Sequence, residues 1–314
     1  MTKKGKRIFK KSERLLCQEP KPVRFQFIHR YHKEFGIKWL CLKLGVSRQG
    51  YYRFINHQPT DQQKKYSTLR STIISLFFKF NFKMGAAMLH NYMINEGYTI
   101  SLGFVKSVLK AHGLKSKIVK TYKKQIKPHQ TFENKLNREF SPMMDSQVKK
   151  KIACDITEWR LNNGKKVYLC AALDLATRAI VGYKVALTSK KELVLDVIEQ
   201  LYKSFPKMAL LFHSDQGSQF TSKQVVEVIR QYGWIQSMSR KGNCWDNAVI
   251  ESFFSIIKRE ELKWCTFHSF IQAERIVKEY IEDYYMTIRP HKSLGGVPPI
   301  QYILKISQST KTQK

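Results

Sequence analysis

From residue 152 to residue 262, short apolar runs alternate with longer segments in which the apolar positions have helical spacing. Three apolar runs come first. They are joined by the short turns NNGKK and ATR, and predict an antiparallel meander of three strands. A helix, a strand, a helix, a strand and a last helix are expected to follow. The eight runs are IACDITEWRL, KKVYLCAALDLAT, AIVGYKVAL, ELVLDVIEQLYKSF, KMALLFHSD, SKQVVEVIRQYG, WIQSMS and NAVIESFFSIIKREEL. This order predicts an α/β fold with a mixed five-stranded sheet.

The N-terminal part of the chain has helical spacing and no strand signal. Residues 22–57 predict helices in which Gly45 makes a turn and Ser47 caps the helix after it. Arg48 and Gln49 then fall in the first turn of that helix, where a recognition helix presents side chains to DNA. An ordinary helical hairpin is the competing interpretation, but the DNA-binding one is favoured.

A second helix-turn-helix pattern lies further along this region. Gly97 breaks the first helix, Ser101 caps the second, and Lys106 lies on that second helix as a candidate DNA contact. The whole chain is therefore expected to divide into five parts. These are a basic tail (1–21), a helical DNA-binding region (22–113), a basic linker (114–151), an α/β core (152–262) and a C-terminal helical segment with a tail (263–314).

Charge points to a polyanionic partner. The formal net charge is +32. Residues 1–150 hold 32 basic and 8 acidic side chains (+24), whereas residues 151–314 hold 24 and 16 (+8). A membrane surface would also attract this charge, but the helix-turn-helix patterns favour nucleic acid.

Other classes of protein are disfavoured by composition. No apolar run approaches the roughly 20 residues that cross a bilayer, and the basic N-terminus lacks the apolar core of a signal peptide, so a cytoplasmic protein is expected. The six cysteines form no C-x-x-C pair, which argues against a zinc knuckle or a redox motif. Cys154 and Cys170 lie in apolar runs and are expected to be buried thiols.

Three carboxylates stand out against the predicted elements. Asp155 lies on the first strand, Asp215 ends the fourth, and Glu251 falls one turn into the last helix, with 35 residues between Asp215 and Glu251. Carboxylates are hard donors suited to Mg²⁺ or Mn²⁺, and three of them together repel one another without a cation. The pattern predicts a site with two divalent ions that acts on a phosphodiester. By contrast, Asp174 is interpreted as a hairpin residue.

The segments that carry these acids show a family resemblance. The spans CDITEW, HSDQGSQF, SRKGNCWDNAVIESFF and YYMTIRPHKSLGGVPPIQY resemble the integrase-type transposases of the insertion sequence 3 group, and the likeness extends over residues 22–305. It implies a ribonuclease-H-like integrase core and a DDE triad carried over to Asp155, Asp215 and Glu251. It also implies Mg²⁺-dependent cleavage and strand transfer at the DNA ends of a bacterial insertion sequence.

Partners are also expected for this chain, and two alternative functions remain open. An oligomer on paired DNA ends is expected, together with the product of an upstream reading frame. A hydrolytic nuclease of the same fold and a DNA-binding regulator remain the alternatives. The family usually has Trp and Thr where this chain has Ile152 and Cys154, which bears on packing beside the site more than on its chemistry.

Several polar residues are candidates for supporting roles. His213 and Gln216 flank Asp215 and are candidates to orient a ligand or contact DNA. Lys241 and Asn243 precede the last helix and are candidates to bind phosphate, with a plain surface loop as the alternative.

Two further groups lie closer to the C-terminus. Lys258 and Arg259 lie on the last helix of the core, as DNA contacts or as solvated charges. The RPH segment, Arg289 to His291, either docks the C-terminal segment or contacts DNA.

Overall fold

The computed structural model describes residues 16–117, 150–239 and 247–312. The chain divides into two compact units, Met1–Ser71 and Thr72–Lys314. The boundary falls within α5 (Asp61–Lys79), so the second helix-turn-helix pattern belongs to the unit that also holds the sheet. It does not coincide with the boundary expected near residue 113. No helix in the described ranges is both long enough and apolar enough to cross a membrane.

The first unit is built on three short helices. They are α2 (Lys21–Phe35), α3 (Ile37–Lys43) and α4 (Arg48–Ile55). Gly45 adopts a positive φ of 61° in the turn before α4, and Ser47 Oγ accepts the Gly50 N–H at 3.0 Å. The predicted turn and cap are thereby confirmed. Among the described residues of this unit, one cluster of buried side chains consists of Phe25, Ile28, Leu40, Cys41, Leu44 and Tyr51.

The second unit begins with a helical pair. Beyond α5 come α6 (Ala86–Asn95) and α7 (Leu102–Ala111), which pack against each other. Ser101 caps α7 as expected, because its Oγ accepts the Phe104 N–H at 3.2 Å.

The sheet of the second unit has the predicted five strands. They are β1 (Lys150–Arg160), β2 (Lys166–Asp174), β3 (Ile180–Ala186), β4 (Leu210–Ser214) and β5 (Ile235–Met238), and their order across the sheet is β3-β2-β1-β4-β5. The first three pair antiparallel, whereas β4 runs parallel to both β1 and β5. The predicted meander and the mixed sheet are confirmed, and β1 is the central strand.

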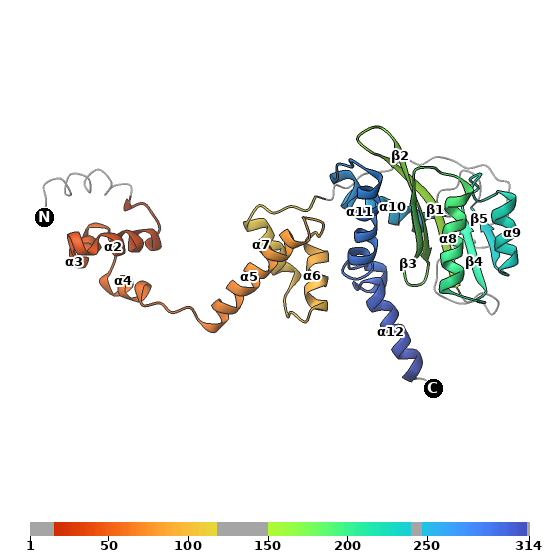
Figure 1. Ribbon diagram of the computed structural model, residues 1–314. Helices are drawn as coiled ribbons and strands as arrows, with labels where there is room; N and C mark the ends of the chain where they lie inside the picture. Colours follow the sequence, from red (N-terminus) through yellow and green to blue (C-terminus); the bar gives the residue numbers. More distant parts are fainter. Residues whose placement is uncertain (1–15, 118–149, 240–246, 313–314) are drawn as a thin grey trace. The chain divides into compact units, whose positions relative to one another are not determined.

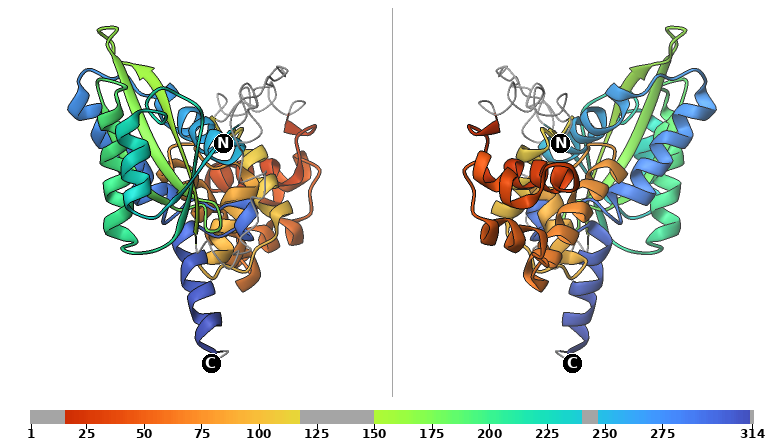
Figure 2. Two further views of the ribbon diagram at one scale, coloured as in Figure 1. Left: turned by 90° about the vertical axis from the view of Figure 1, so that its right-hand side faces the viewer. Right: turned by 90° about the vertical axis from the view of Figure 1, so that its left-hand side faces the viewer.

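Helices cover both faces of this sheet (Figure 1). On one face lie α8 (Lys191–Ser204) and α9 (Lys223–Gln231), whose apolar side chains join those of the strands in the main core. α10 (Ala248–Glu260) packs against β1 and β2 on the opposite face (Figure 2). Because strand residues alternate between faces, the core positions Ile152 and Cys154 leave Asp155 directed to the α10 side.

The two strand cysteines are buried thiols, as expected. Both are fully buried, and their sulfur atoms lie 3.6 Å apart across β1 and β2. Burial, together with the contact to Cys170, raises the pKa of the Cys154 thiol well above its usual value. A thiol held protonated in this way packs as a small apolar side chain.

The C-terminal segment wraps back onto the sheet and the α5–α7 region. It consists of η2 (Leu262–Trp264), α11 (Phe270–Glu279), η3 (Tyr280–Tyr285), η4 (Lys292–Leu294) and α12 (Pro299–Thr312). Tyr183 on β3 donates to Glu282 Oε1 at 2.6 Å. Asn95 on α6 donates to the Gly296 carbonyl at 3.0 Å. These contacts make the segment part of the second unit.

Candidate active site

Two strands place Asp155 and Asp215 at the same level of the sheet. β1 and β4 run parallel, and Ala153 pairs with His213. Asp155 lies two residues beyond Ala153, and Asp215 lies two residues beyond His213, immediately after β4 ends. Continuing the parallel register therefore places the two aspartates side by side on the α10 face.

The electrostatics of Asp155 show which charges surround it. Burial raises the pKa of this carboxyl to about 7, helped first by Asp215 and then by Glu251, while the Ile156 N–H and Lys258 act in the opposite direction. Both other carboxylates therefore lie within electrostatic reach of Asp155. Since Glu251 and Lys258 are seven residues apart on α10, they share one face of that helix. The structure thus places Asp215, Glu251 and Lys258 close enough to Asp155 to influence the pKa of its carboxyl.

Each aspartate is oriented by a backbone N–H. The Ile156 N–H donates to Asp155 Oδ1 at 2.7 Å, and the Gly217 N–H donates to Asp215 Oδ1 at 2.9 Å. One carboxylate oxygen of each is thus hydrogen-bonded within the protein. Among the described residues no three acidic, His or Cys side chains are already grouped closely enough to hold a metal ion. Asp215 and Glu251 thus act electrostatically on Asp155, but the three acids are not closed around a common point.

The loop after β4 holds Asp215 in place. Gln216 donates its amide to the Ser239 carbonyl at 2.9 Å, and Gln219 donates to the Ser189 carbonyl at 3.0 Å. A Cβ on Gly217 would lie 3.0 Å from both Asp215 Oδ1 and the Gln219 side-chain oxygen. The absence of a side chain at Gly217 is therefore what allows this loop to close around the carboxylate.

Gly217→Ala is expected to lower catalytic activity about tenfold or more, because displacing a catalytic group by even a fraction of an ångström is costly. The control is Gly103→Ala in α7, where the nearest atom to an added Cβ lies 3.9 Å away. That change should leave activity unchanged and stabilise the helix by roughly 0.5–1 kcal/mol. Activity and thermal unfolding should be measured on both variants. Equal activity in the two would show that Gly217 does not position Asp215.

His213 was missed as a structural residue by sequence reasoning. It is fully buried, and its ring nitrogens lie 2.9 Å from Ser237 Oγ and 3.1 Å from Ser239 Oγ. Of its two expected roles, to orient a ligand or to contact DNA, the second does not fit a ring enclosed between β4 and the β5 region. Its position in the apolar run before Asp215 was the signal for burial.

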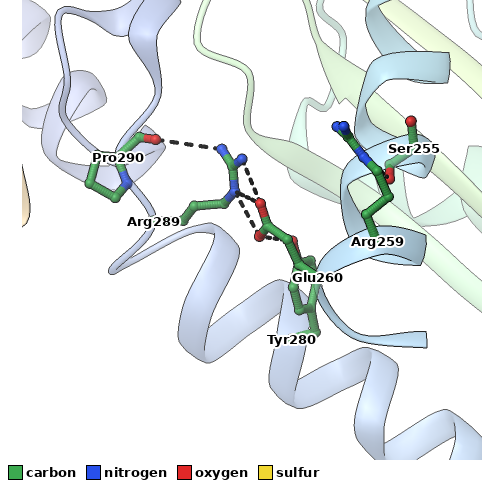
Figure 3. Close-up of polar contacts among 6 residues, drawn as sticks. All are labelled: Ser255, Arg259, Glu260, Tyr280, Arg289 and Pro290. Atoms are coloured by element: carbon green, nitrogen blue, oxygen red, sulfur yellow. Dashed lines mark hydrogen bonds and ion pairs between the residues drawn. The ribbon is translucent and has the colours of Figure 1, made fainter. Parts of the chain in front are cut away.

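The RPH segment docks the C-terminal segment onto α10 (Figure 3). Arg289 is buried, and its Nη2 and Nε lie 2.8 and 3.1 Å from Glu260 Oε1. Tyr280 donates its hydroxyl to Glu260 Oε2 at 2.8 Å. Burial would lower the pKa of Arg289, but Glu260 holds it above its usual value. Of the two interpretations left open for this segment, docking is the one that the geometry supports.

The last residue of this segment is also buried. His291 packs its ring edge-on against Tyr285, with the ring centroids 4.6 Å apart. Burial, followed by the charge of Arg289, lowers the pKa of His291 to about 3. The imidazole is therefore neutral at physiological pH and does not offer a charge to DNA.

The remaining predicted contacts lie at different places in the structure. Arg48 and Gln49 are exposed in the first turn of α4 in the first unit, and Lys106 is exposed on α7. Arg259 donates its Nε to the Ser255 carbonyl on α10 at 3.0 Å (Figure 3). Lys241 and Asn243 lie outside the described residues.

The site region matches known protein families. One integrase core domain family matches residues 145–244, and a second matches residues 232–299. Together the two matches cover β1 to η4, and hence all three carboxylates.

Full-length relatives also match the chain. A 31 kDa protein of insertion element IS600 from Shigella sonnei is 30% identical over 273 residues, covering 86% of this chain and 99% of that protein. The transposase InsF for insertion sequence IS3A from Escherichia coli K12 is 28% identical over 286 residues, covering 89% and 98%. The putative transposase InsK for IS150 from the same organism is 31% identical over 241 residues, covering 76% and 83%.

Solved structures overlap the chain in part. The HTLV-2 integrase catalytic core domain in complex with magnesium is 15% identical, covers 51% of this chain and 99% of that chain, and has a TM-score of 0.39. The Mos1 transposase catalytic domain is also 15% identical, covers 43% and 71%, and has a TM-score of 0.34.

Proposed function

Since the chain belongs to the insertion sequence 3 family of transposases, we propose that it cuts and joins DNA at the ends of an insertion sequence, with Asp155, Asp215 and Glu251 as its catalytic carboxylates. Membership of the family, with its integrase core, makes it an enzyme of DNA transposition of the polynucleotidyl-transferase type. The finer proposal is supported by the charges around Asp155, since burial and then Asp215 and Glu251 raise the pKa of its carboxyl.

The donor set suits a hard divalent cation. Asp155, Asp215 and Glu251 would hold it, because carboxylate oxygens are the ligands that Mg²⁺ and Mn²⁺ prefer. Their mutual repulsion supports this assignment, since a cation would relieve it. When bound, two such ions supply activation of the attacking oxygen and stabilisation of the leaving oxygen. The Ile156 and Gly217 N–H groups contribute by fixing the two aspartates before DNA arrives.

The reaction is a phosphoryl transfer at each step. In cleavage, the oxygen of a water molecule bonds to phosphorus, the P–O3′ bond breaks, and a 3′-hydroxyl leaves. In joining, that 3′-hydroxyl attacks a phosphodiester of the target strand and releases a new 3′-hydroxyl. One phosphodiester bond forms for each one broken, so joining needs no external energy source. Lys258, which lies within electrostatic reach of Asp155, is proposed to bind a phosphate beside the scissile bond.

A strand-transfer assay tests this function. The full-length protein is incubated with pre-cut element ends, target DNA and Mg²⁺, and joined products are separated from hydrolysed ones on a denaturing gel. Joined products are expected. Cleavage without joining would identify a hydrolytic nuclease instead. The absence of both activities would favour a DNA-binding regulator.

The first unit is proposed to bind duplex DNA through α4. Arg48 and Gln49 are exposed at the start of α4, after the turn that Gly45 and Ser47 form, as the N-terminal residues of a recognition helix are. Lys106, Arg259, Lys241 and Asn243 are proposed as further phosphate contacts.

Arg48→Ala is expected to weaken duplex binding about 5- to 10-fold and to reduce the salt dependence of binding by about one phosphate contact. Arg70→Ala, an exposed arginine on α5, is the control and should change affinity less than about twofold. Fluorescence anisotropy over a range of salt concentrations measures both. If the two variants have the same salt dependence, α4 is not the DNA-binding helix.

An upstream reading-frame product and an oligomer on paired ends are proposed as partners. The resemblance to the family motivates both. The DNA that flanks this reading frame tests the first, since inverted repeats and an overlapping upstream frame are expected there. Sedimentation of the protein with and without end DNA tests the second, and a monomer in both conditions would reject it.

A further inference from the structure

Trp264 is a large apolar side chain held at the surface just beyond the helix that carries Glu251. It ends η2, four residues after α10, and is 49% exposed. Its indole Nε1 donates to the Arg259 carbonyl at 2.7 Å, and the Lys117 ammonium lies 5.7 Å from the ring centroid. The hydrogen bond and the cation–π contact fix the ring although it remains open to solvent. An aromatic ring that is both exposed and fixed in place is suited to stacking on a flat ligand.

The surface around this ring is positive. Lys263 is exposed beside it in the chain, and the Lys117 ammonium lies against its ring, whereas Arg259 contacts it through the backbone carbonyl. The two acids that precede it in the chain are already paired within the protein. Glu260 forms the buried ion pair with Arg289, and Glu261 forms an ion pair with Lys83. The ligand that suits the patch of Trp264, Lys117 and Lys263 is therefore an anion with an aromatic face.

The patch lies within reach of DNA bound at the carboxylates. Glu251 and Glu260 are nine residues apart on α10, which corresponds to roughly 14 Å at 1.5 Å per residue. A nucleic-acid strand rises about 3.4 Å per nucleotide, so the end of α10 lies roughly four nucleotides from Glu251. Lys258 and Arg259 lie on α10 between these two points.

We propose that Trp264 stacks on an unpaired base of the DNA strand bound at the active site, while Lys117 and Lys263 hold the adjacent phosphates. The inference rests on the proposed function and adds a substrate class to it, DNA whose strands are separated next to the cut. Stacking on an aromatic side chain contributes about 1–3 kcal/mol per base and tolerates any base, because every base has a π face. Such a contact would secure the separated strand without requiring a particular sequence there.

The experiment compares two DNA substrates of the same sequence, one fully paired and one with a short unpaired end. Fluorescence anisotropy measures the affinity of the full-length protein for each, in EDTA so that no cleavage takes place. The ratio of the two affinities isolates the contribution of the unpaired bases, because contacts to the duplex are common to both substrates.

Trp264→Ala is expected to weaken binding of the unpaired-end substrate about 5- to 100-fold, while affinity for the paired duplex changes less than about twofold. Trp264→Phe, which keeps an aromatic face, should retain most of the affinity for the unpaired end. Ile271→Ala is the matched control, since Ile271 is an apolar residue on α11 that is 76% exposed, and it should leave both affinities unchanged.

Two results would overturn the inference. One is an unchanged ratio in Trp264→Ala when thermal unfolding shows that the variant is folded. The other is a change in self-association, measured by sedimentation, with no change in the ratio, which would make Trp264 a protein contact. The anisotropy assay contains no free divalent cation and does not measure DNA cleavage. Failure of the strand-transfer assay would therefore refute the proposed function without altering this ratio.

Discussion

Asp155→Asn is expected to reduce the rates of both cleavage and joining by about 10³-fold or more. Its affinity for DNA in the absence of divalent cations should stay within about twofold of that of the parent protein. The amide keeps the size of the side chain and still accepts the Ile156 N–H, so the strand should not move. It loses the negative charge that a divalent cation requires. Cation assistance contributes several kcal/mol, and each 1.36 kcal/mol corresponds to a factor of ten in rate. The strand-transfer assay and anisotropy measure the two quantities.

The control for this prediction is another aspartate of the same unit. Asp196 is exposed on α8, on the face of the sheet opposite α10, and Asp196→Asn should leave the rates unchanged. Asp215→Asn and Glu251→Gln should each be about as damaging as Asp155→Asn, and combining them should add little, because the three act as one unit. If Asp155→Asn keeps every activity of the parent, catalysis is not the role of this protein, and a DNA-binding regulator becomes the favoured interpretation.

The placement of Asp155 and Asp215 followed from local pattern alone. The run KMALLFHSD is apolar up to its last three residues, so a buried strand that ends near Asp215 was predictable. The apolar run IACDITEWRL likewise predicted a strand that carries Asp155. That β4 would lie beside β1 is a long-range pairing. It came from the order of the elements and from the resemblance, and the register confirms it.

The partners of the glutamates at the end of the core could not be predicted from local sequence pattern. Glu251, Glu260 and Glu261 all lie in or directly after α10, and the sequence singled out Glu251 by its spacing from Asp215. The structure separates the three by their partners, since Glu260 binds Arg289, Glu261 binds Lys83, and Glu251 acts on Asp155. All three partners are distant in sequence, so nothing in the local spacing could identify them.

A signal for the burial of Glu260 was nevertheless present. It continues the stripe of Ile250, Phe253 and Ile257, whose spacing of three or four residues is that of a buried helix face. An acid on such a stripe is expected to have a partner, because a buried charge without one is very costly. Periodicity thus predicts that a partner exists but does not say that it is Arg289.

Removing that partner should have the largest effect on stability. Arg289→Met is expected to destabilise the second unit by about 3–5 kcal/mol, because it leaves the Glu260 carboxylate buried beside Tyr280 without its cation. For a unit of this size the melting temperature should fall by about 6–20 °C. Urea denaturation and calorimetry of the full-length protein measure the two quantities.

A matched pair at the surface provides the control. Lys203 and Glu199 on α8 lie 2.7 Å apart with exposed side chains, so Lys203→Met should cost less than about 1 kcal/mol. The double change Glu260→Leu with Arg289→Met should recover much of the stability lost in Arg289→Met, since it removes the orphaned charge as well. An Arg289→Met variant no less stable than Lys203→Met would mean that the Glu260–Arg289 pair does not hold the C-terminal segment to α10. The interpretation that the RPH segment docks the C-terminal segment would then also be wrong.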